Sequence, residues 1–135
     1  MSDFNTDVIR QFRANGGRVG GIFEGRTNMV LITTTGAKSG RQITTPLVYV
    51  PDDDRIVLIA SNGGADRHPA WYHNLKANPT VTVELGTESY EATAEVLTGT
   101  EADDLFDRMV AIAPDFAEYR AKTSRRIPVV AVNRA

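Results

Sequence analysis

Cysteine is absent from the sequence. Without a thiol, the chain can form no disulfide, no thiolate metal site and no cysteine nucleophile. Long apolar runs are missing too, since no stretch reaches the roughly 18 apolar residues of a membrane-spanning helix. The opening segment, MSDFNTDVIRQFRANGG, also lacks the apolar centre of a signal peptide. We therefore expect a cytoplasmic protein.

Positive charge is not in excess, because 15 lysine and arginine residues face 17 aspartate and glutamate residues. General binders of nucleic acid carry such an excess, so we expect no nucleic-acid partner. Histidine is scarce as well: His68 and His73 are five residues apart, whereas a helical zinc pair is about four apart. No serine stands in the glycine-flanked turn of a hydrolase nucleophile. The sequence thus predicts neither a metal site nor a hydrolase.

The size and composition of the chain fit one globular domain over residues 1–135, with 41% apolar and 24% charged residues. Phe4, Val8 and Phe12 recur with the helical period, which predicts a helix over 3–15 that covers the core. A peripheral contact at the inner face of the membrane, with Arg10 and Arg13 as its positive charges, is the alternative. The glycine-rich stretch 16–27 predicts a connector, so residues 1–20 form an N-terminal helix and connector.

Short β-branched and apolar runs predict six strands, at 29–34, 44–50, 55–61, 80–85, 91–97 and 127–132. The turns PDDDR and Gly86-Thr87 make antiparallel hairpins of the second and third strands and of the fourth and fifth. We expect a mainly antiparallel α+β fold. Six strands in so short a chain favour a small barrel with helices at its openings over a flat sandwich.

Three further helices are expected. The first spans 68–79, with Asp66 or His68 as its cap. The second begins at Thr100 and buries Leu105, Met109 and Ile112. The third follows the break at Pro114 and spans 115–122.

The stretch TTTGAKSGR, residues 33–41, places a glycine, a lysine and a serine directly after an apolar strand. A P-loop needs glycine immediately before the lysine and a helix after it. Here Ala37 precedes Lys38, the upstream glycine is missing, and a β-branched run follows. We therefore do not expect an NTPase.

The same loop can still bind an anion. Its two glycines allow left-handed backbone, so that the amides of Ala37, Lys38 and Ser39 can converge as a nest. Lys38 and Arg41 add two positive charges, which suits a phosphate or phosphodiester. A hairpin loop with solvated charges is the alternative that this stretch alone leaves open.

A second group of residues lies in IASNGGADRHPAWYHNL, residues 59–75, which runs from a strand through a Gly-Gly turn into a helix. Ser61 and Asn62 offer small polar groups beside backbone that can approach a ligand closely. Trp71 and Tyr72 offer flat apolar surface, although core packing is the alternative for both. Together with the cationic loop, this pattern suits a planar ring with a phosphate-bearing tail, as in a flavin-type cofactor.

Three separated segments carry a resemblance to a known family: LITTTGAKSGRQITTPLVYV, LIASNGGADRHPAWYHNLKANPTVTVEL and APDFAEYRAKTSRRIPVVAV. In this order they resemble the deazaflavin-dependent nitroreductase family of actinobacteria, over almost the whole chain after Gly20. The resemblance implies a six-stranded split β-barrel that binds coenzyme F(420), an 8-hydroxy-5-deazaflavin. It also implies two-electron reduction of a small-molecule acceptor, either a quinone or a nitroaromatic compound.

The resemblance assigns site residues by position. Its phosphate-binding loop falls on Ala37, Lys38 and Ser39, with Arg41 beside them. The deazaflavin and its tail would contact the strand residues Ile43, Thr44, Thr45, Pro46, Leu47 and Val48, the loop residues Ile59, Ala60, Ser61 and Asn62, the helix residues Ala70, Trp71, Tyr72, His73 and Asn74, and Phe116. Ser61 and Tyr119 are the catalytic candidates: the proton for the reduced product would come from Tyr119, Ser61 or water, and the sequence does not choose among them.

The chain departs from its relatives at several of these positions. Relatives often carry a basic residue in place of Ile43, and we expect Arg41 to take over that charge. Some carry lysine in place of Asn62, and nitroimidazole-reducing relatives carry tyrosine in place of Val48, Ala113 and Phe116. The reduction of bulky nitroimidazoles is therefore the activity that the resemblance supports least.

Two other functions remain open at this stage. An FMN-binding split-barrel oxidoreductase would use the same loop for the FMN phosphate. A non-catalytic carrier of a flavin or deazaflavin would need the same pocket without turnover. In each case we expect a monomer or a weak homodimer.

Overall fold

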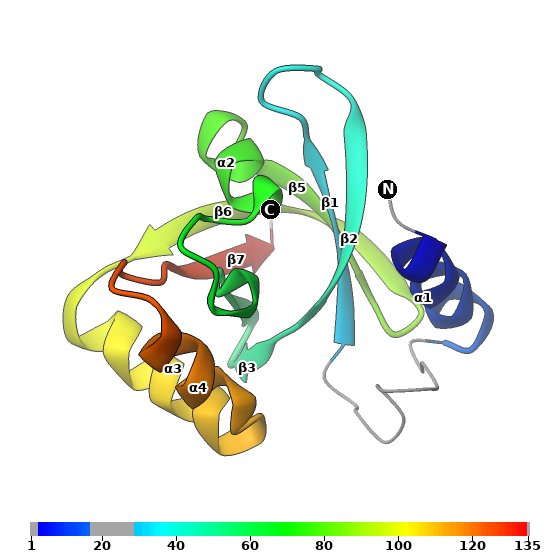
Figure 1. Ribbon diagram of the computed structural model, residues 1–135. Coiled ribbons are helices and arrows are strands. Elements are labelled where there is room, and N and C mark those ends of the chain that lie inside the picture. Colours follow the sequence, from blue (N-terminus) through cyan, green and yellow to red (C-terminus); the bar gives the residue numbers. More distant parts are fainter. Residues whose placement is uncertain (1–2, 17–28, 135) are drawn as a thin grey trace.

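The computed structural model describes residues 3–16 and 29–134, and the connector predicted over 16–27 lies outside them except for Gly16. One sheet of seven strands forms the centre of the molecule (Figure 1). Its order is β2-β1-β5-β6-β7-β4-β3, and every neighbouring pair is antiparallel. The strands are β1 (Met29–Thr35), β2 (Gln42–Val48), β3 (Val50–Asp52), β4 (Arg55–Ile59), β5 (Thr80–Leu85), β6 (Glu88–Leu97) and β7 (Val129–Arg134).

The sheet curls into an open barrel whose two edge strands are β2 and β3. Helix α1 (Asp3–Ala14) lies beside β1 and β2 on one side, whereas α3 (Gly99–Ile112) and α4 (Asp115–Lys122) lie on the other (Figure 1). Helix α2 (Ala70–Ala77) lies beside β1, at the end of the strand where the chain turns into β2. The prediction of a mainly antiparallel barrel with helices around it is confirmed.

Several strands are buried on both faces. Val30 and Ile32 of β1 point into the curl and pack with Trp71 and Leu75 of α2. Because successive strand residues face opposite sides, Met29 and Leu31 point outward, where they pack against Val8, Ile9 and Phe12 of α1. On β4, Val57 and Ile59 likewise face a second outer core with Leu105, Phe106 and Met109 of α3. Burial on both faces explains why these strands read as continuous apolar runs.

The predicted count of six strands is wrong, because the run 44–50 is divided at Tyr49 between β2 and β3. Residues 42–48 pair with β1, and only Val50–Asp52 pairs with β4. Pro46, in the middle of β2, donates no backbone hydrogen bond, which a strand tolerates at a sheet edge. The hairpin of β5 and β6 is confirmed, with β6 starting at Glu88 rather than at residue 91.

The four predicted helices are present, with two corrections. Neither Asp66 nor His68 caps α2: its N-cap is Pro69, without a side-chain hydrogen bond, and Asp66 instead accepts one from Thr123. On α3, Ile112 is 44% exposed, and Phe106 takes its expected place in the core. On α1, Val8 and Phe12 are buried as predicted, whereas the side chain of Phe4 lies outside what the structure describes.

Candidate functional site

The loop 36–41 is the tight connection of a hairpin between β1 and β2. The Gly36 amide donates to the Arg41 carbonyl at 2.7 Å, and the Gly40 amide donates to the Gly36 carbonyl at 3.0 Å. Ser39 Oγ accepts from the Arg41 amide at 3.2 Å and would lie only 2.5 Å from a Cβ atom on Gly36. Only Gly40 of the two glycines has a positive φ, of 71°. A strand follows the loop, as expected for a loop that is not a P-loop.

The backbone amides of this loop are not all available to an anion. The Ala37 amide donates to Asn74 Oδ1 at 3.0 Å, and the Arg41 amide is held by Ser39. The amides of Lys38 and Ser39 have no acceptor in the part of the chain that the structure describes. The nest expected from the sequence is therefore reduced from three amides to two, beside the exposed side chains of Lys38 and Arg41.

Asn74 joins α2 to this loop. Its side chain is 7% exposed, and its Nδ2 donates to the hydroxyl of the fully buried Thr34 at 3.2 Å. Because both ends of the amide are occupied by protein partners, Asn74 holds the loop in place. Sequence reasoning placed Asn74 at the cofactor but missed Thr34, which has no motif to mark it.

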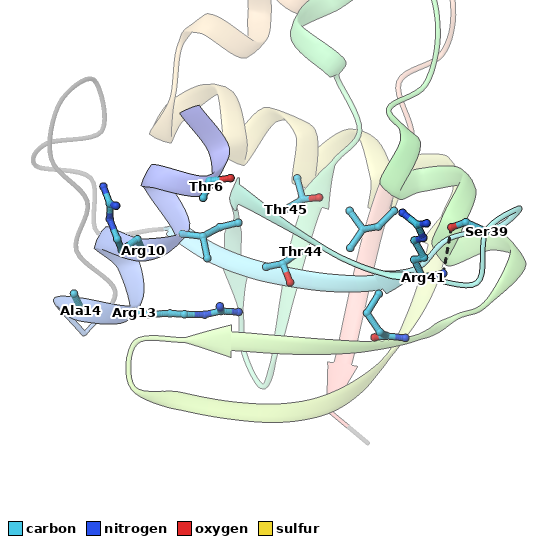
Figure 2. Close-up of a pocket in the computed structure, with 11 residues that line it drawn as sticks. Thr6, Arg10, Arg13, Ala14, Ser39, Arg41, Thr44 and Thr45 are labelled. Atoms are coloured by element: carbon cyan, nitrogen blue, oxygen red, sulfur yellow. Dashed lines mark hydrogen bonds between the residues drawn. The ribbon is translucent and has the colours of Figure 1, made fainter. Parts of the chain in front are cut away.

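An open groove of about 1120 Å³ lies between α1 and β2 (Figure 2). Five of the predicted site residues line it: Ser39, Arg41, Ile43, Thr44 and Thr45. The others are Gln42 and five α1 residues that sequence reasoning did not place at the site, namely Thr6, Ile9, Arg10, Arg13 and Ala14. Their helical spacing was the only signal that could have grouped them.

Three guanidinium groups line the groove, and two of them are ion-paired. Figure 2 shows Arg10 and Arg13 of α1 at one end and Arg41 with Ser39 at the other. Arg13 forms a two-pronged ion pair with Glu84 of β5 at 2.9 and 3.0 Å, and Arg10 pairs with Asp7. Arg41 has no carboxylate partner among the described residues, so its charge is open to a ligand.

The segment after β4 forms a second, separate part of the site. Ser61 is 6% exposed, and Asn62, Gly63 and Gly64 adopt successive left-handed conformations with φ of 50°, 65° and 85°. Helix α4 packs directly on this turn, since a Cβ atom on Gly64 would lie 3.1 Å from Tyr119 Cα. The fold therefore brings the backbone of Tyr119, one catalytic candidate, against the turn that follows Ser61, the other.

The aromatic candidates divide between the turn and the core. The rings of Phe116 and Tyr119 meet edge to face with centroids 5.1 Å apart. Trp71 and Tyr72 are 6% and 7% exposed and belong to the inner core, as expected if they serve core packing. Leu47 also packs against that core, so these three residues stabilise the barrel whatever else they contact.

Arg125, which sequence reasoning missed, connects the turn to the segment before β7. Its guanidinium donates to the carbonyls of Ala60, Ser61 and Ala65 and lies 3.0 Å from His68 Nδ1. Burial lowers the pKa of His68 below its usual value, and the positive charges of Arg125, His73 and Lys76 lower it further. A neutral His68 can accept the Arg125 hydrogen bond at Nδ1, so the two groups are compatible at neutral pH.

Comparison with known proteins identifies the family. A family model described as F(420)H(2)-dependent quinone reductase matches residues 5–134. The chain belongs to this family. It is 38% identical over 128 residues to the F(420)H(2)-dependent quinone reductase of Mycobacterium tuberculosis strain H37Rv, covering 91% of this chain and 85% of the relative.

Solved structures agree with the family assignment. An F(420)-H(2) dependent reductase, FDR-A, matches at 44% identity with a TM-score of 0.73 over 78% of this chain and 94% of that one. A structure described as a domain-swapped dimer matches at the same identity and TM-score over 78% and 80% of the two chains. The heme storage protein HutZ of Vibrio cholerae shares the fold alone, at 12% identity and a TM-score of 0.63 over 94% and 87%.

Within the described part of this quinone reductase family member, no group of three or more histidine, aspartate or glutamate side chains is arranged to hold a metal ion. No helix of residues 3–16 and 29–134 is both long and apolar enough to cross a membrane. The candidate site consists of the loop 36–41, the groove beside it and the turn 61–64.

Proposed function

We propose that this protein transfers a hydride from reduced coenzyme F(420) to a quinone, as expected for a coenzyme F(420)-dependent oxidoreductase. The observation that carries the proposal is the loop 36–41. It presents two backbone amides without acceptors among the described residues and the side chains of Lys38 and Arg41, beside a groove lined by arginine side chains. That donor set fits a phosphodiester followed by an anionic tail.

In this proposal, different residues bind different parts of the cofactor. Lys38, Ser39 and Arg41 bind the phosphodiester, and the groove between α1 and β2 holds the anionic tail through its guanidinium groups. The deazaflavin ring lies along the turn that follows Ile59, near Ser61 and Asn62. Phe116 and Tyr119 of α4 close over the acceptor, since α4 packs directly on that turn.

The bound deazaflavin supplies the hydride, because it acts as a two-electron carrier. The contribution of the chain is to hold ring and acceptor close together and to keep water away from them. The hydroxyl of Tyr119 or of Ser61 donates a proton to the reduced product. Neither role needs a nucleophile or a metal ion.

The proposal also covers the electron acceptor, contact with a membrane and the oligomeric state. A quinone is the first acceptor class, and a nitroaromatic compound is the second. We propose that α1 covers the core and forms one wall of the groove rather than anchoring the protein to a membrane, because Val8, Ile9 and Phe12 are already buried against β1. In this proposal the protein is a monomer or a weak homodimer.

Fluorescence titration with coenzyme F(420) and with FMN tests the cofactor assignment. Lys38→Ala should weaken coenzyme F(420) binding by about 1.5–3 kcal/mol, or roughly 10- to 150-fold, the range for a charge-assisted hydrogen bond. Arg126→Ala is the control, because it removes an equal charge from an exposed pair with Asp103 on α3. Unchanged binding in Lys38→Ala would remove Lys38 from the phosphate site.

FMN binding without coenzyme F(420) binding would replace the proposal with an FMN oxidoreductase. Turnover of reduced coenzyme F(420) with menadione or a nitroaromatic compound then separates an enzyme from a carrier. Binding without turnover on either acceptor would favour the carrier.

A further inference from the structure

One side chain from the C-terminal part of the chain controls the backbone of the turn after β4. Arg125 Nη2 donates to the carbonyls of Ala60 at 3.3 Å and of Ser61 at 2.8 Å. Its Nε donates to the Ala65 carbonyl at 2.8 Å, and its Nη1 meets His68 Nδ1 at 3.0 Å. A single guanidinium therefore engages four acceptors spread over nine residues of sequence, 60–68.

We propose that Arg125 is a positioning residue that aims the backbone amides of Ser61 and Asn62 at the ring of the bound deazaflavin. This inference rests on the proposed function, in which that ring lies along the turn. Arg125 itself does not touch the ring in this proposal and acts only through the peptide groups that it holds.

Peptide geometry supports the proposal. In a trans peptide the carbonyl and the following N–H point in opposite directions. With the carbonyls of Ala60 and Ser61 directed at Arg125, the amides of Ser61 and Asn62 point away from it. Neither amide has an acceptor within the part of the chain that the structure describes. A ring edge with carbonyl and nitrogen acceptors is a suitable partner for two such donors.

The turn needs an external constraint to keep these directions. Asn62, Gly63 and Gly64 all have left-handed backbone, and two of the three are glycines, whose backbone rotates easily. The planar fork of arginine fixes several acceptors at once, whereas lysine offers one compact charge. Lysine at position 125 would therefore keep the charge and lose the orientation.

The same segment keeps other anchors when Arg125 is changed. Thr123 donates to Asp66 at 2.8 Å, and the Ala60 amide donates to the Pro128 carbonyl at 2.9 Å. Arg125→Lys should therefore fold, which makes it a suitable variant. Arg126→Lys is the matched control, since Arg126 is the neighbouring residue but is exposed and, among the described residues, pairs with the exposed Asp103 alone.

The experiment compares two ligands, the whole coenzyme F(420) and a ribityl deazaflavin that lacks the phosphodiester and tail. Arg125→Lys should raise the Kd for both by a similar factor, at least tenfold. Lys38→Ala should raise the Kd for the whole cofactor alone, and Arg126→Lys should change neither. In ligand-free protein, the ¹H–¹⁵N amide signals of Ser61 and Asn62 should shift in Arg125→Lys and stay in place in Arg126→Lys.

Unchanged Kd values in Arg125→Lys, with the wild type binding both ligands, would overturn this inference and leave the proposed function standing. Unshifted Ser61 and Asn62 signals in Arg125→Lys would overturn it as well. A wild type that binds neither ligand would overturn the proposed function first and this role of Arg125 with it.

Discussion

The side-chain oxygen of Asn74 lies 3.0 Å from the backbone nitrogen of Ala37 and accepts its hydrogen bond. Through this contact, α2 fixes the loop that carries Lys38, although the two residues are 37 positions apart in the sequence. The Asn74 amide also donates to Thr34, so one side chain satisfies two groups of the β1–β2 hairpin.

Asn74→Ala should lower the free energy of unfolding by about 1–3 kcal/mol, the cost of leaving buried polar partners unsatisfied. It should also weaken coenzyme F(420) binding, because the loop loses its connection to α2. Urea unfolding and fluorescence titration measure the two effects. Asn78→Ala, at the exposed C-terminal end of the same helix, is the control. A loop that binds equally well in Asn74→Ala would show that Asn74 serves stability alone.

Gly64→Ala should displace α4. A Cβ atom there would lie 3.1 Å from Tyr119 Cα, against the backbone of the helix, where little adjustment is available. Gly63→Ala is the matched control, since its φ of 65° carries a similar strain of roughly 1–2 kcal/mol while its Cβ would meet nothing within 4 Å. Urea unfolding should show a larger loss for Gly64→Ala, by about 1–3 kcal/mol. Equal losses would mean that α4 does not rest on Gly64 in solution.

His68 should make the protein less stable in mild acid. Burial, and then the charge of Arg125, holds the pKa of His68 below its usual value, so the folded state takes up its proton later than the unfolded chain does. The unfolded chain therefore binds more protons once the pH falls below about 6.5, and the free energy of unfolding falls with it. Urea unfolding between pH 7.5 and 5.5 measures this slope.

His68→Gln should flatten that slope, and His73→Gln, on the exposed side of α2, should retain it. A slope that persists in His68→Gln would assign the pH dependence to other groups.

The ion pair of Arg13 and Glu84 should contribute a small stabilisation free energy to the packing of the end of α1 against β5. The two side chains are 52% and 21% exposed, so water screens them and the coupling should be about 0.5–1 kcal/mol. A double-mutant cycle of Arg13→Ala and Glu84→Ala, measured by urea unfolding, gives this energy. It should decrease in high salt. A coupling near zero at low salt would mean that the apolar contacts of α1 hold the helix alone.

Local signals predicted most of the fold. The helices and the hairpin of β5 and β6 depend on periodicity and turn residues that are adjacent in the sequence. The division of 44–50 at Tyr49 was not predictable in the same way, because it depends on which strands each half pairs with. Similarly, the helical period allowed either Ile112 or Phe106 to join Leu105 and Met109 on the buried face of α3. The packing of α3 against the sheet buries Phe106.

The same distinction between local signals and distant contacts applies to the candidate site. The loop around Lys38 was visible because its glycines and charges are consecutive. Arg125 was not visible, because three of its partners are backbone carbonyls some 60 residues away, and a carbonyl leaves no mark on the sequence. The groove was missed in part because its second wall, α1, precedes the segments that carry the resemblance.

Tyr49 is the only residue between the last residue of β2 and the first of β3, so one residue ties the two free edges of the sheet together. The chain therefore crosses from one edge of the sheet to the other at Tyr49. Gln42, at the other end of β2, lies six residues, or roughly 20 Å, from Val48. Lys38 and its loop thus lie at the end of the β2 edge that is far from this crossing.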